Sequence, residues 1–276
     1  MKIDFSKFSN SLELKENGIW FAKSTQVISY PDDGNDLCLE LEDFSFWFKH
    51  RNNCIIELVK QYSVCENFFD VGGGNGYVAL GLQNEGVNVT LLEPGIKGVL
   101  NAKKRNIENI ICATTQNCDL PNGFVENIGA FDVIEHIEDE HIFLKSCHEM
   151  LKTNGKIFVT VPAFSFLWSN EDNYSGHFRR YTIETLEKSL EIAGFKLLFD
   201  SYLFSPLPLP IYLLRSLPSK LNMHKNFSDK DKFIKEHNSN KSSGLLEKIW
   251  KWELSKIKSS SKIPFGSTVI AVAQKK

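Results

Sequence analysis

Polar and apolar residues along the chain follow two patterns, which predict two kinds of secondary-structure element. Short apolar runs stop at glycine, proline or acidic residues, as buried strands do. Longer stretches place apolar side chains three or four residues apart, which is typical of amphipathic helices. The predicted strands are residues 67–71, 87–92, 109–113, 128–134, 156–161, 195–202 and 267–273. The predicted helices are residues 45–62, 75–85, 95–104, 138–151, 182–193 and 245–258.

This alternation of strands and helices predicts a doubly wound α/β fold with helices on both faces of a mainly parallel sheet. Such sheets bind ligands at the carboxyl ends of their strands, near the point where the strand order reverses. The residues that directly follow each strand are therefore the first candidates for a functional site.

The pattern divides the chain into four segments. Residues 1–65 are expected to form an N-terminal extension, irregular or lightly structured up to residue 43 and followed by a helix that caps the core. Residues 66–203 carry the alternating pattern, and residues 265–276 supply the last strand of the same core. Between them, residues 204–264 break the pattern and are predicted to be an insertion.

The insertion begins with an apolar run in which Pro206, Pro208 and Pro210 prevent a regular helix from forming at its start. Three interpretations are open: a hydrophobic cap over a substrate cavity, which we favour, a dimer contact, or a surface that touches lipid. A polar stretch, residues 226–243, separates this run from the helix predicted at residues 245–258.

The composition narrows the class of partners. Of the 276 residues, 42% are hydrophobic and 24% are charged, and the formal net charge is −2. This near balance argues against nucleic-acid binding through a broad basic surface. No apolar stretch approaches the roughly 20 residues of a membrane span, and Met1–Asn10 contain no apolar signal core. We expect a soluble, cytoplasmic protein, with peripheral membrane contact and the oligomeric state left open.

The cysteines point to a reduced protein without a metal site. None forms a CxxC pair, and their spacing matches no zinc template. Several lie in apolar runs, where a free thiol behaves as a small hydrophobic side chain. The six cysteines are Cys38, Cys54, Cys65, Cys112, Cys118 and Cys147.

The strongest chemical signal is the run Asp70-Val-Gly-Gly-Gly-Asn-Gly76, which ends one predicted strand and opens a helix. Glycines allow backbone N–H groups to approach a ligand closely. Glu93 ends the next strand, where a carboxylate can accept hydrogen bonds from the ribose hydroxyls of an adenosine moiety. A dinucleotide site would need a small residue at the position of Tyr77. Asp70 suits a ligand with an amino group, and the spacing therefore favours S-adenosyl-L-methionine (SAM) over NAD.

These motifs resemble those of class I SAM-dependent methyltransferases, in particular the broad group (types 11 and 12) that includes ubiquinone-biosynthesis methyltransferases. The likeness runs from about residue 44 to residue 204. It rests on the segments Asp70–Gly76, Val89–Pro94, Phe131–Ile137 and Leu151–Pro162. The resemblance implies a Rossmann-like sheet of seven strands, the last of them antiparallel, and a cofactor that is converted to S-adenosyl-L-homocysteine.

The resemblance also implies which residues hold the methionyl and ribose parts of the cofactor. Asp70 would lie near the amino group, and Glu93 would bind the ribose. The residues expected against the methionyl and ribose parts are Gly72, Gly73 and Gly74. Arg51, on the preceding helix, would pair with the cofactor carboxylate, because a guanidinium fork suits a carboxylate. The alternative for Arg51 is a solvated charge on the helix.

The remaining cofactor contacts implied by the resemblance surround the adenine and the sulfonium. Pro94 would line the adenine pocket, and Gln116 and Asn117 would border the adenine, although this loop departs from the Gly-Asp pattern usual in the family. Phe131 and His136 would flank the sulfonium end.

Two histidines are candidates for the general base that a hydroxyl acceptor requires. His136 follows a strand end, and its alternatives are a helix cap or a cofactor contact. His177 lies in a polar and aromatic segment after the fifth strand, which should overhang the pocket and recognise an acceptor, anionic acceptors included. The acceptor contacts expected from this segment are Tyr174, His177, Arg179, Arg180 and Tyr181. The alternative for the two arginines is a set of structural salt bridges.

The sequence thus predicts an enzyme that moves a methyl group from SAM to a small-molecule, lipid-linked or sugar-linked acceptor, with O-methylation favoured. A SAM-binding or interaction protein without turnover is the second hypothesis. An NAD-dependent oxidoreductase is the third, and the glycine spacing disfavours it.

Overall fold

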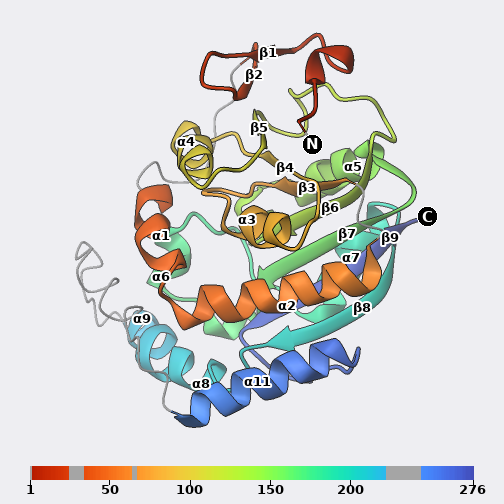
Figure 1. Ribbon diagram of the computed structural model, residues 1–276. Helices are drawn as coiled ribbons and strands as arrows, with labels where there is room; N and C mark the ends of the chain where they lie inside the picture. The colour runs from red at the N-terminus through yellow and green to blue at the C-terminus, as the bar shows by residue number, and fades with distance from the viewer. Residues whose placement is uncertain (1, 25–33, 64–66, 222–243) are drawn as a thin grey trace.

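The computed structural model describes residues 2–24, 34–63, 67–221 and 244–276, and these form one mixed sheet between two layers of helices (Figure 1). The predicted polar stretch of residues 226–243 and Cys65 lie outside the described residues. The α/β class with helices on both faces is confirmed. Within the described ranges, no helix has both the length and the apolar character needed to cross a membrane.

Within the described residues, nine strands pair in the order β1-β2-β5-β4-β3-β6-β7-β9-β8. The strands are β1 (Leu12–Leu14), β2 (Trp20–Ala22), β3 (Phe68–Val71), β4 (Val89–Leu92), β5 (Asn109–Cys112), β6 (Val125–Phe131), β7 (Leu151–Pro162), β8 (Phe195–Leu203) and β9 (Thr268–Lys275). The five central strands β5, β4, β3, β6 and β7 run parallel. β9 lies between β7 and β8 and is antiparallel to both, so the predicted antiparallel last strand is confirmed.

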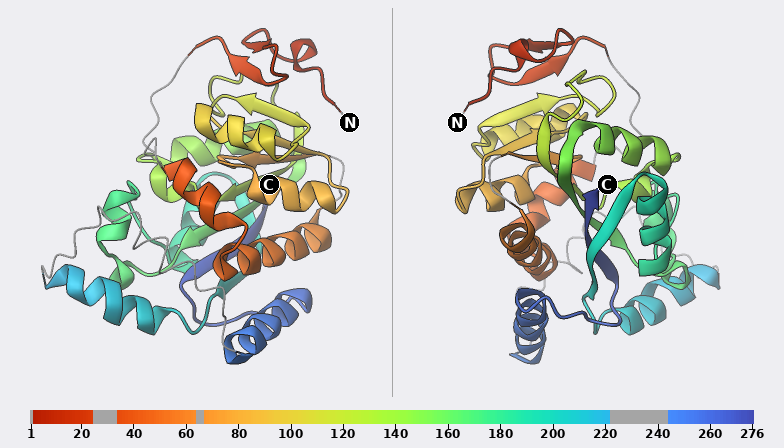
Figure 2. Two further views of the ribbon diagram at one scale, coloured as in Figure 1. Left: turned by 60° about the vertical axis from the view of Figure 1, so that its left-hand side comes forward. Right: turned by 90° about the vertical axis from the view of Figure 1, so that its right-hand side faces the viewer.

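Helices cover both faces because the central strands are buried on both sides (Figure 2). In β3, Phe68 packs with the cluster of α2, α3, α4 and α11, whereas Phe69 packs with that of α5 and α7. The helices are α1 (Gly34–Glu42), α2 (Phe46–Tyr62), α3 (Tyr77–Asn84), α4 (Ile96–Lys104), α5 (Glu140–Met150), α6 (Asn170–Tyr174), α7 (Ile183–Ile192), α8 (Pro208–Ile211), α9 (Leu217–Lys220) and α11 (Gly244–Lys258). Short helical turns are η1 (Phe5–Lys7), η2 (Ile134–His136), η3 (Ser165–Leu167) and η4 (Tyr212–Ser216).

The N-terminal segment corrects the expected strand count. β1 and β2 form a short hairpin that extends the sheet of the described residues to nine strands instead of seven. Trp20 of β2 pairs with Ile111 of β5 and contacts Phe5 edge-on, with ring centroids 5.8 Å apart. The hairpin is therefore part of the core, and the extension is only partly helical.

The strand predicted at residues 156–161 begins earlier than expected. β7 starts at Leu151, which is fully buried and pairs with Val125 across an irregularity in the register. Asn154 adopts a left-handed φ of 63°, a conformation that asparagine tolerates better than most residues. The residues between the predicted helix and the predicted strand therefore belong to one longer, irregular strand.

The described part of the insertion packs on the outside of the core. α8, η4 and α9 follow one another without a break, with Pro208 at the start of α8 and Pro218 near the start of α9. α11 packs along α2, where the side chain of Glu253 accepts a hydrogen bond from His50 at 2.8 Å and two from the backbone N–H groups of Phe204 and Ser205. The insertion thus braces the helix that carries Arg51.

Candidate active site

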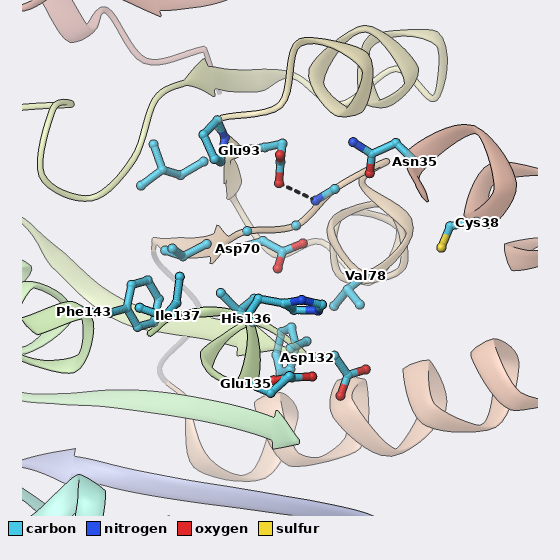
Figure 3. A pocket seen from close by; sticks show the side chains of 18 of the residues that line it. Asn35, Cys38, Asp70, Val78, Glu93, Asp132, Glu135, His136, Ile137 and Phe143 are labelled. Carbon is cyan, nitrogen blue, oxygen red and sulfur yellow. Dashed lines mark hydrogen bonds between the residues drawn. The ribbon is translucent and has the colours of Figure 1, made fainter. Parts of the chain in front are cut away.

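A cavity of about 700 Å³ opens at the carboxyl ends of β3, β4 and β6, where the sheet order reverses (Figure 3). It is lined by the loop after β3, the end of β4, the turn η2 and residues of α1 and α2. No described residue of 204–264 lines it, so the role of the insertion as a substrate cap stays a prediction.

The glycine loop after β3 leaves no room for larger side chains. Gly72, Gly74 and Gly76 have φ values of 68°, 51° and 75°, which L-residues rarely adopt. A Cβ on Gly73 would lie 2.3 Å from Leu91 Cδ1 and 2.6 Å from Asp70 Oδ2. The loop backbone therefore forms a tight wall at this end of the cavity.

Glu93 holds the glycine loop against the end of β4. Its carboxylate accepts hydrogen bonds from the backbone N–H groups of Gly74 at 3.0 Å and Gly95 at 2.6 Å. Burial raises the pKa of Glu93, and these two hydrogen bonds oppose the shift. The side chain is 8% exposed and lines the cavity, where its remaining lone pairs are available to a ligand.

Asp70 is a buried carboxyl group that lines the cavity and lacks hydrogen-bond partners of normal geometry. Both of its carboxyl oxygens are unsatisfied, and the residue is 1% exposed. Burial raises the pKa of Asp70 to about 7, and the charge of Arg51 and the Ala79 N–H only partly oppose this. A buried carboxyl without partners is costly, so a bound cationic group would stabilise it.

α1 covers the glycine loop through side chains that the sequence analysis missed. Asn75 donates to the backbone oxygen of Asn35 at 2.7 Å and to Glu42 at 3.3 Å. Glu42 in turn accepts from Arg105 at 3.0 Å. Asn35 and Cys38 line the cavity. The polar character of this segment hid the helix, and its contacts depend on partners far away in sequence.

Arg51 lies on α2 at the cavity wall, where it forms an ion pair with Asp132. Its guanidinium also lies over the rings of Trp47 and Phe48, at 4.7 and 5.6 Å from the centroids. The Nε of Arg51 has no hydrogen-bond partner. Arg51 is buried, so the alternative of a solvated helix charge is wrong.

His136 and His177 lie together on the cavity wall, with ring centroids 4.6 Å apart. Nδ1 of His177 lies 2.8 Å from a carboxylate oxygen of Asp172, which orients the ring. Burial disfavours ionisation of Asp172, but hydrogen bonds with His177 and Arg180 outweigh it and lower its pKa. Burial lowers the pKa of His136 to about 4, with a further contribution from His177, so His136 is a weak base.

Glu135, beside His136 in η2, is a second buried carboxyl group at the cavity. It is 1% exposed, and its Oε2 has no hydrogen-bond partner. Burial raises the pKa of Glu135 to about 8 although Arg51 and Arg180 oppose the shift. The sequence analysis missed Glu135 because a carboxylate next to a histidine carries no local signal of burial.

The structure brings most of the predicted cofactor residues together. Ten of them line the same cavity: Arg51, Asp70, Gly72, Gly73, Gly74, Glu93, Pro94, Gln116, Phe131 and His136. Asn117 is not among the lining residues. Its side-chain oxygen accepts from Thr114 N at 2.6 Å and its amide donates to Ser24 O at 2.9 Å, so it shapes its own loop.

Of the predicted acceptor residues, only His177 lines the cavity. Arg179 donates to Glu140 and to the backbone oxygens of Ile137 and Glu138, and Arg180 donates to Asp172 and Ala163. These are structural contacts, the alternative that the sequence left open. The remaining two predicted residues are Tyr174, which is 54% exposed, and Tyr181, which is buried against Glu140.

Comparison with known families gives a match over more than half of the chain. The model of a family described as a methyltransferase domain matches residues 35–198. A ubiquinone biosynthesis O-methyltransferase of Vibrio parahaemolyticus is 30% identical over 129 residues, which cover 45% of this chain and 51% of that protein. A similar enzyme of Colwellia psychrerythraea is 30% identical over 97 residues, 33% of this chain and 39% of that protein. The chain thus spans about half or less of these relatives.

Solved structures share the fold at lower identity. Phosphoethanolamine N-methyltransferase 2 of Haemonchus contortus, in complex with S-adenosyl-L-methionine, superposes with a TM-score of 0.58 at 18% identity. The match covers 90% of this chain and 58% of that one. A SAM-dependent methyltransferase of Thermotoga maritima gives a TM-score of 0.53 at 17% identity, covering 87% of this chain and 99% of that one.

Proposed function

Since the chain belongs to the methyltransferase-domain family, we propose that it is a class I SAM-dependent methyltransferase that methylates a hydroxyl group of a small-molecule, lipid-linked or sugar-linked acceptor. The alignments with ubiquinone O-methyltransferases support oxygen as the methylated atom. The observation that carries the proposal is the buried, unsatisfied Asp70 next to the glycine wall and Glu93 in one cavity.

The residues of this cavity fit SAM. The unsatisfied oxygens of Asp70 are suited to the cofactor's amino group, and Glu93 has acceptor capacity left for ribose hydroxyls. Arg51 would hold the carboxylate with its free Nε, while Asp132 keeps the guanidinium in place. The glycine wall, Gly72 to Gly74, would lie against the methionyl and ribose parts. Pro94 and Gln116 would border the adenine, and Phe131 and His136 the sulfonium end.

When bound, SAM supplies a methyl group on a sulfonium that is already a good leaving group. The protein must therefore align the acceptor and help its hydroxyl lose a proton. His136 and His177 mark the end of the cavity where this would happen. Asp172 fixes the ring of His177, which makes His177 the better base, because His136 has a depressed pKa.

Calorimetric titration with SAM, S-adenosyl-L-homocysteine and NAD tests the cofactor. We expect wild type to bind the first two and Glu93→Ala to bind them about 1–3 kcal/mol more weakly, the cost of leaving buried polar groups unpaired. Glu191→Ala, an exposed acidic residue on α7, is the matched control and should bind like wild type. Tighter binding of NAD than of SAM would overturn the proposal.

Methyl transfer is then measured with labelled SAM and hydroxyl acceptors of the quinol, sugar and lipid-linked classes. Turnover of a hydroxyl acceptor by wild type, reduced at least tenfold in His177→Ala with SAM affinity unchanged, is the expected result. SAM binding without turnover on any of these classes would favour the rival hypothesis of a SAM-binding protein without catalysis.

A further inference from the structure

Three side chains at the acceptor end of the cavity bring their polar atoms close together, and a role for His177 as general base does not account for the buried carboxyl group among them. These are Glu135, His136 and His177, and one candidate ligand atom of each lies within 4.8 Å of those of the others. We propose that this cluster binds a divalent transition-metal ion. Two imidazoles and one carboxylate are the donor set of catalytic zinc sites and of non-haem iron sites, which keep a coordination position open.

A buried carboxylate oxygen without a partner is the independent observation that supports the site. Glu135 is 1% exposed, lines the cavity and leaves Oε2 without a hydrogen bond. The two guanidinium groups that act on it, those of Arg51 and Arg180, are each already paired with another carboxylate. A metal ion would give this oxygen the partner that the protein does not supply.

One of the two histidine ligands, His177, is held by a carboxylate as in known metal sites. Asp172 holds Nδ1 of His177 at 2.8 Å, which leaves Nε2 for coordination. A carboxylate behind a ligating histidine fixes the ring and raises its basicity, and such partners are usual in zinc sites. Asp172 accepts hydrogen bonds from Arg180 and from the backbone N–H of Ser169, and these fix the carboxylate that orients His177. All three proposed ligands line the cavity, so an open coordination position would face the acceptor.

The consequence for catalysis rests on the proposed function, whereas metal binding itself does not. An acceptor hydroxyl that coordinates the metal ion would have a lowered pKa. Its O–H bond would break, the proton would pass to water, and the oxygen would remain on the metal ion as the nucleophile. His177 would then act as a ligand and not as the base.

Titration of chelator-treated protein with Co²⁺, followed by visible absorption and calorimetry, tests the site. We expect one equivalent to bind to wild type, with at least tenfold weaker binding in Glu135→Gln and in His177→Ala. His141→Ala is the control, since it removes an exposed histidine of α5 outside the cluster, and it should bind Co²⁺ like wild type. Absence of stoichiometric binding to wild type, or equal binding by the two cluster variants, would overturn the proposal.

SAM binding is measured on the same samples to separate the two proposals. Cluster variants that still bind SAM are folded, so a loss of Co²⁺ binding in them reports the site. If wild type binds Co²⁺ but not SAM, the metal site stands and the proposed function fails. If it binds SAM but not Co²⁺, the metal site fails and the proposed function stands.

Discussion

The glycine-loop end of the cavity, Asp70 to Gly76 with Glu93, is built largely from backbone that directly follows two neighbouring strands. The histidine end, formed by Glu135, His136, Asp172 and His177, is built from side chains of separate segments. Parallel strands that end at one edge of a sheet place the first set together by topology alone. The second set depends on a hydrogen-bond network that topology does not determine.

The largest expected effect comes from removing the centre of that network. Asp172→Ala leaves Arg180 without its carboxylate and His177 without its orienting partner. Breaking a buried ion pair in this way costs about 3–5 kcal/mol, which chemical denaturation would measure. SAM affinity should stay within about threefold of wild type (about 0.7 kcal/mol) at temperatures where the variant is folded. A similar loss of SAM affinity would show that the two ends are not independent.

Gly73→Ala tests the glycine-loop end of the cavity by adding a side chain where there is no room for one. The new Cβ would overlap Leu91 and Asp70, and overpacking of this kind costs about 1–3 kcal/mol. We expect SAM affinity to fall by up to about 100-fold in calorimetry. Gly244→Ala is the control, because a Cβ there meets no atom within 4 Å. Unchanged SAM affinity in Gly73→Ala would mean that the glycine wall does not touch the cofactor.

The pH dependence of SAM binding sharpens the role of Asp70. Only the ionised carboxylate can pair with the cofactor's ammonium group, and the pKa of Asp70 is raised to about 7 by burial. SAM affinity should therefore fall as the pH drops below 7, by up to about tenfold per pH unit. Calorimetry between pH 5.5 and 8.5 measures this, and Asp70→Asn should bind weakly with a flatter profile. A pH-independent affinity in wild type would contradict the assignment.

The same raised pKa gives the unliganded protein the opposite pH dependence. A carboxyl whose pKa is higher in the folded than in the unfolded chain stabilises the fold at low pH. That contribution decreases as the pH rises from about 4 towards the folded value. Glu135, with a pKa of about 8, acts in the same direction. Carboxylates with lowered pKa values, such as Asp172 and Glu253, act in the opposite direction. The contribution of Asp70 is therefore measured as a difference: without SAM, wild type should lose thermal stability relative to Asp70→Asn as the pH rises from about 4 to about 7.

The smallest effect is expected at Tyr174, which the sequence analysis assigned to acceptor binding. The residue is 54% exposed and does not line the cavity. Tyr174→Ala should change the free energy of unfolding by less than about 0.5 kcal/mol, as usual for exposed positions. Acceptor KM should also stay unchanged. A marked rise in acceptor KM would extend the histidine end beyond the cavity wall.

The contrast between the two ends also explains what could be predicted from the sequence. Asp70, Gly72 and Glu93 follow short apolar runs, so local pattern alone located them. Arg179 and Arg180 were assigned to the acceptor because a sequence does not show which way an arginine points. In the structure they bond to Glu140 and Asp172.

Short elements were hidden for a related reason. β1 and β2 have three residues each, too few for a period to be recognised. They become strands only because β1 pairs with β2 and β2 pairs with β5. α1 was missed because its role depends on Asn75 and Arg105, which are distant in sequence. Such contacts are tertiary, and no local sequence pattern predicts them.

The position of β9 has a consequence for how the chain folds during synthesis. β8 forms its ladder with β9, and β7 has β9 as its second neighbour, although β9 is made after both and after α11. Until the ribosome has released β9, the nascent chain exposes two unpaired strand edges with apolar faces, which are templates for aggregation. The sheet can close only after translation has passed residue 275. A cell that makes this protein would therefore need to shield the nascent chain, for instance with a chaperone, over the whole interval from β7 to β9.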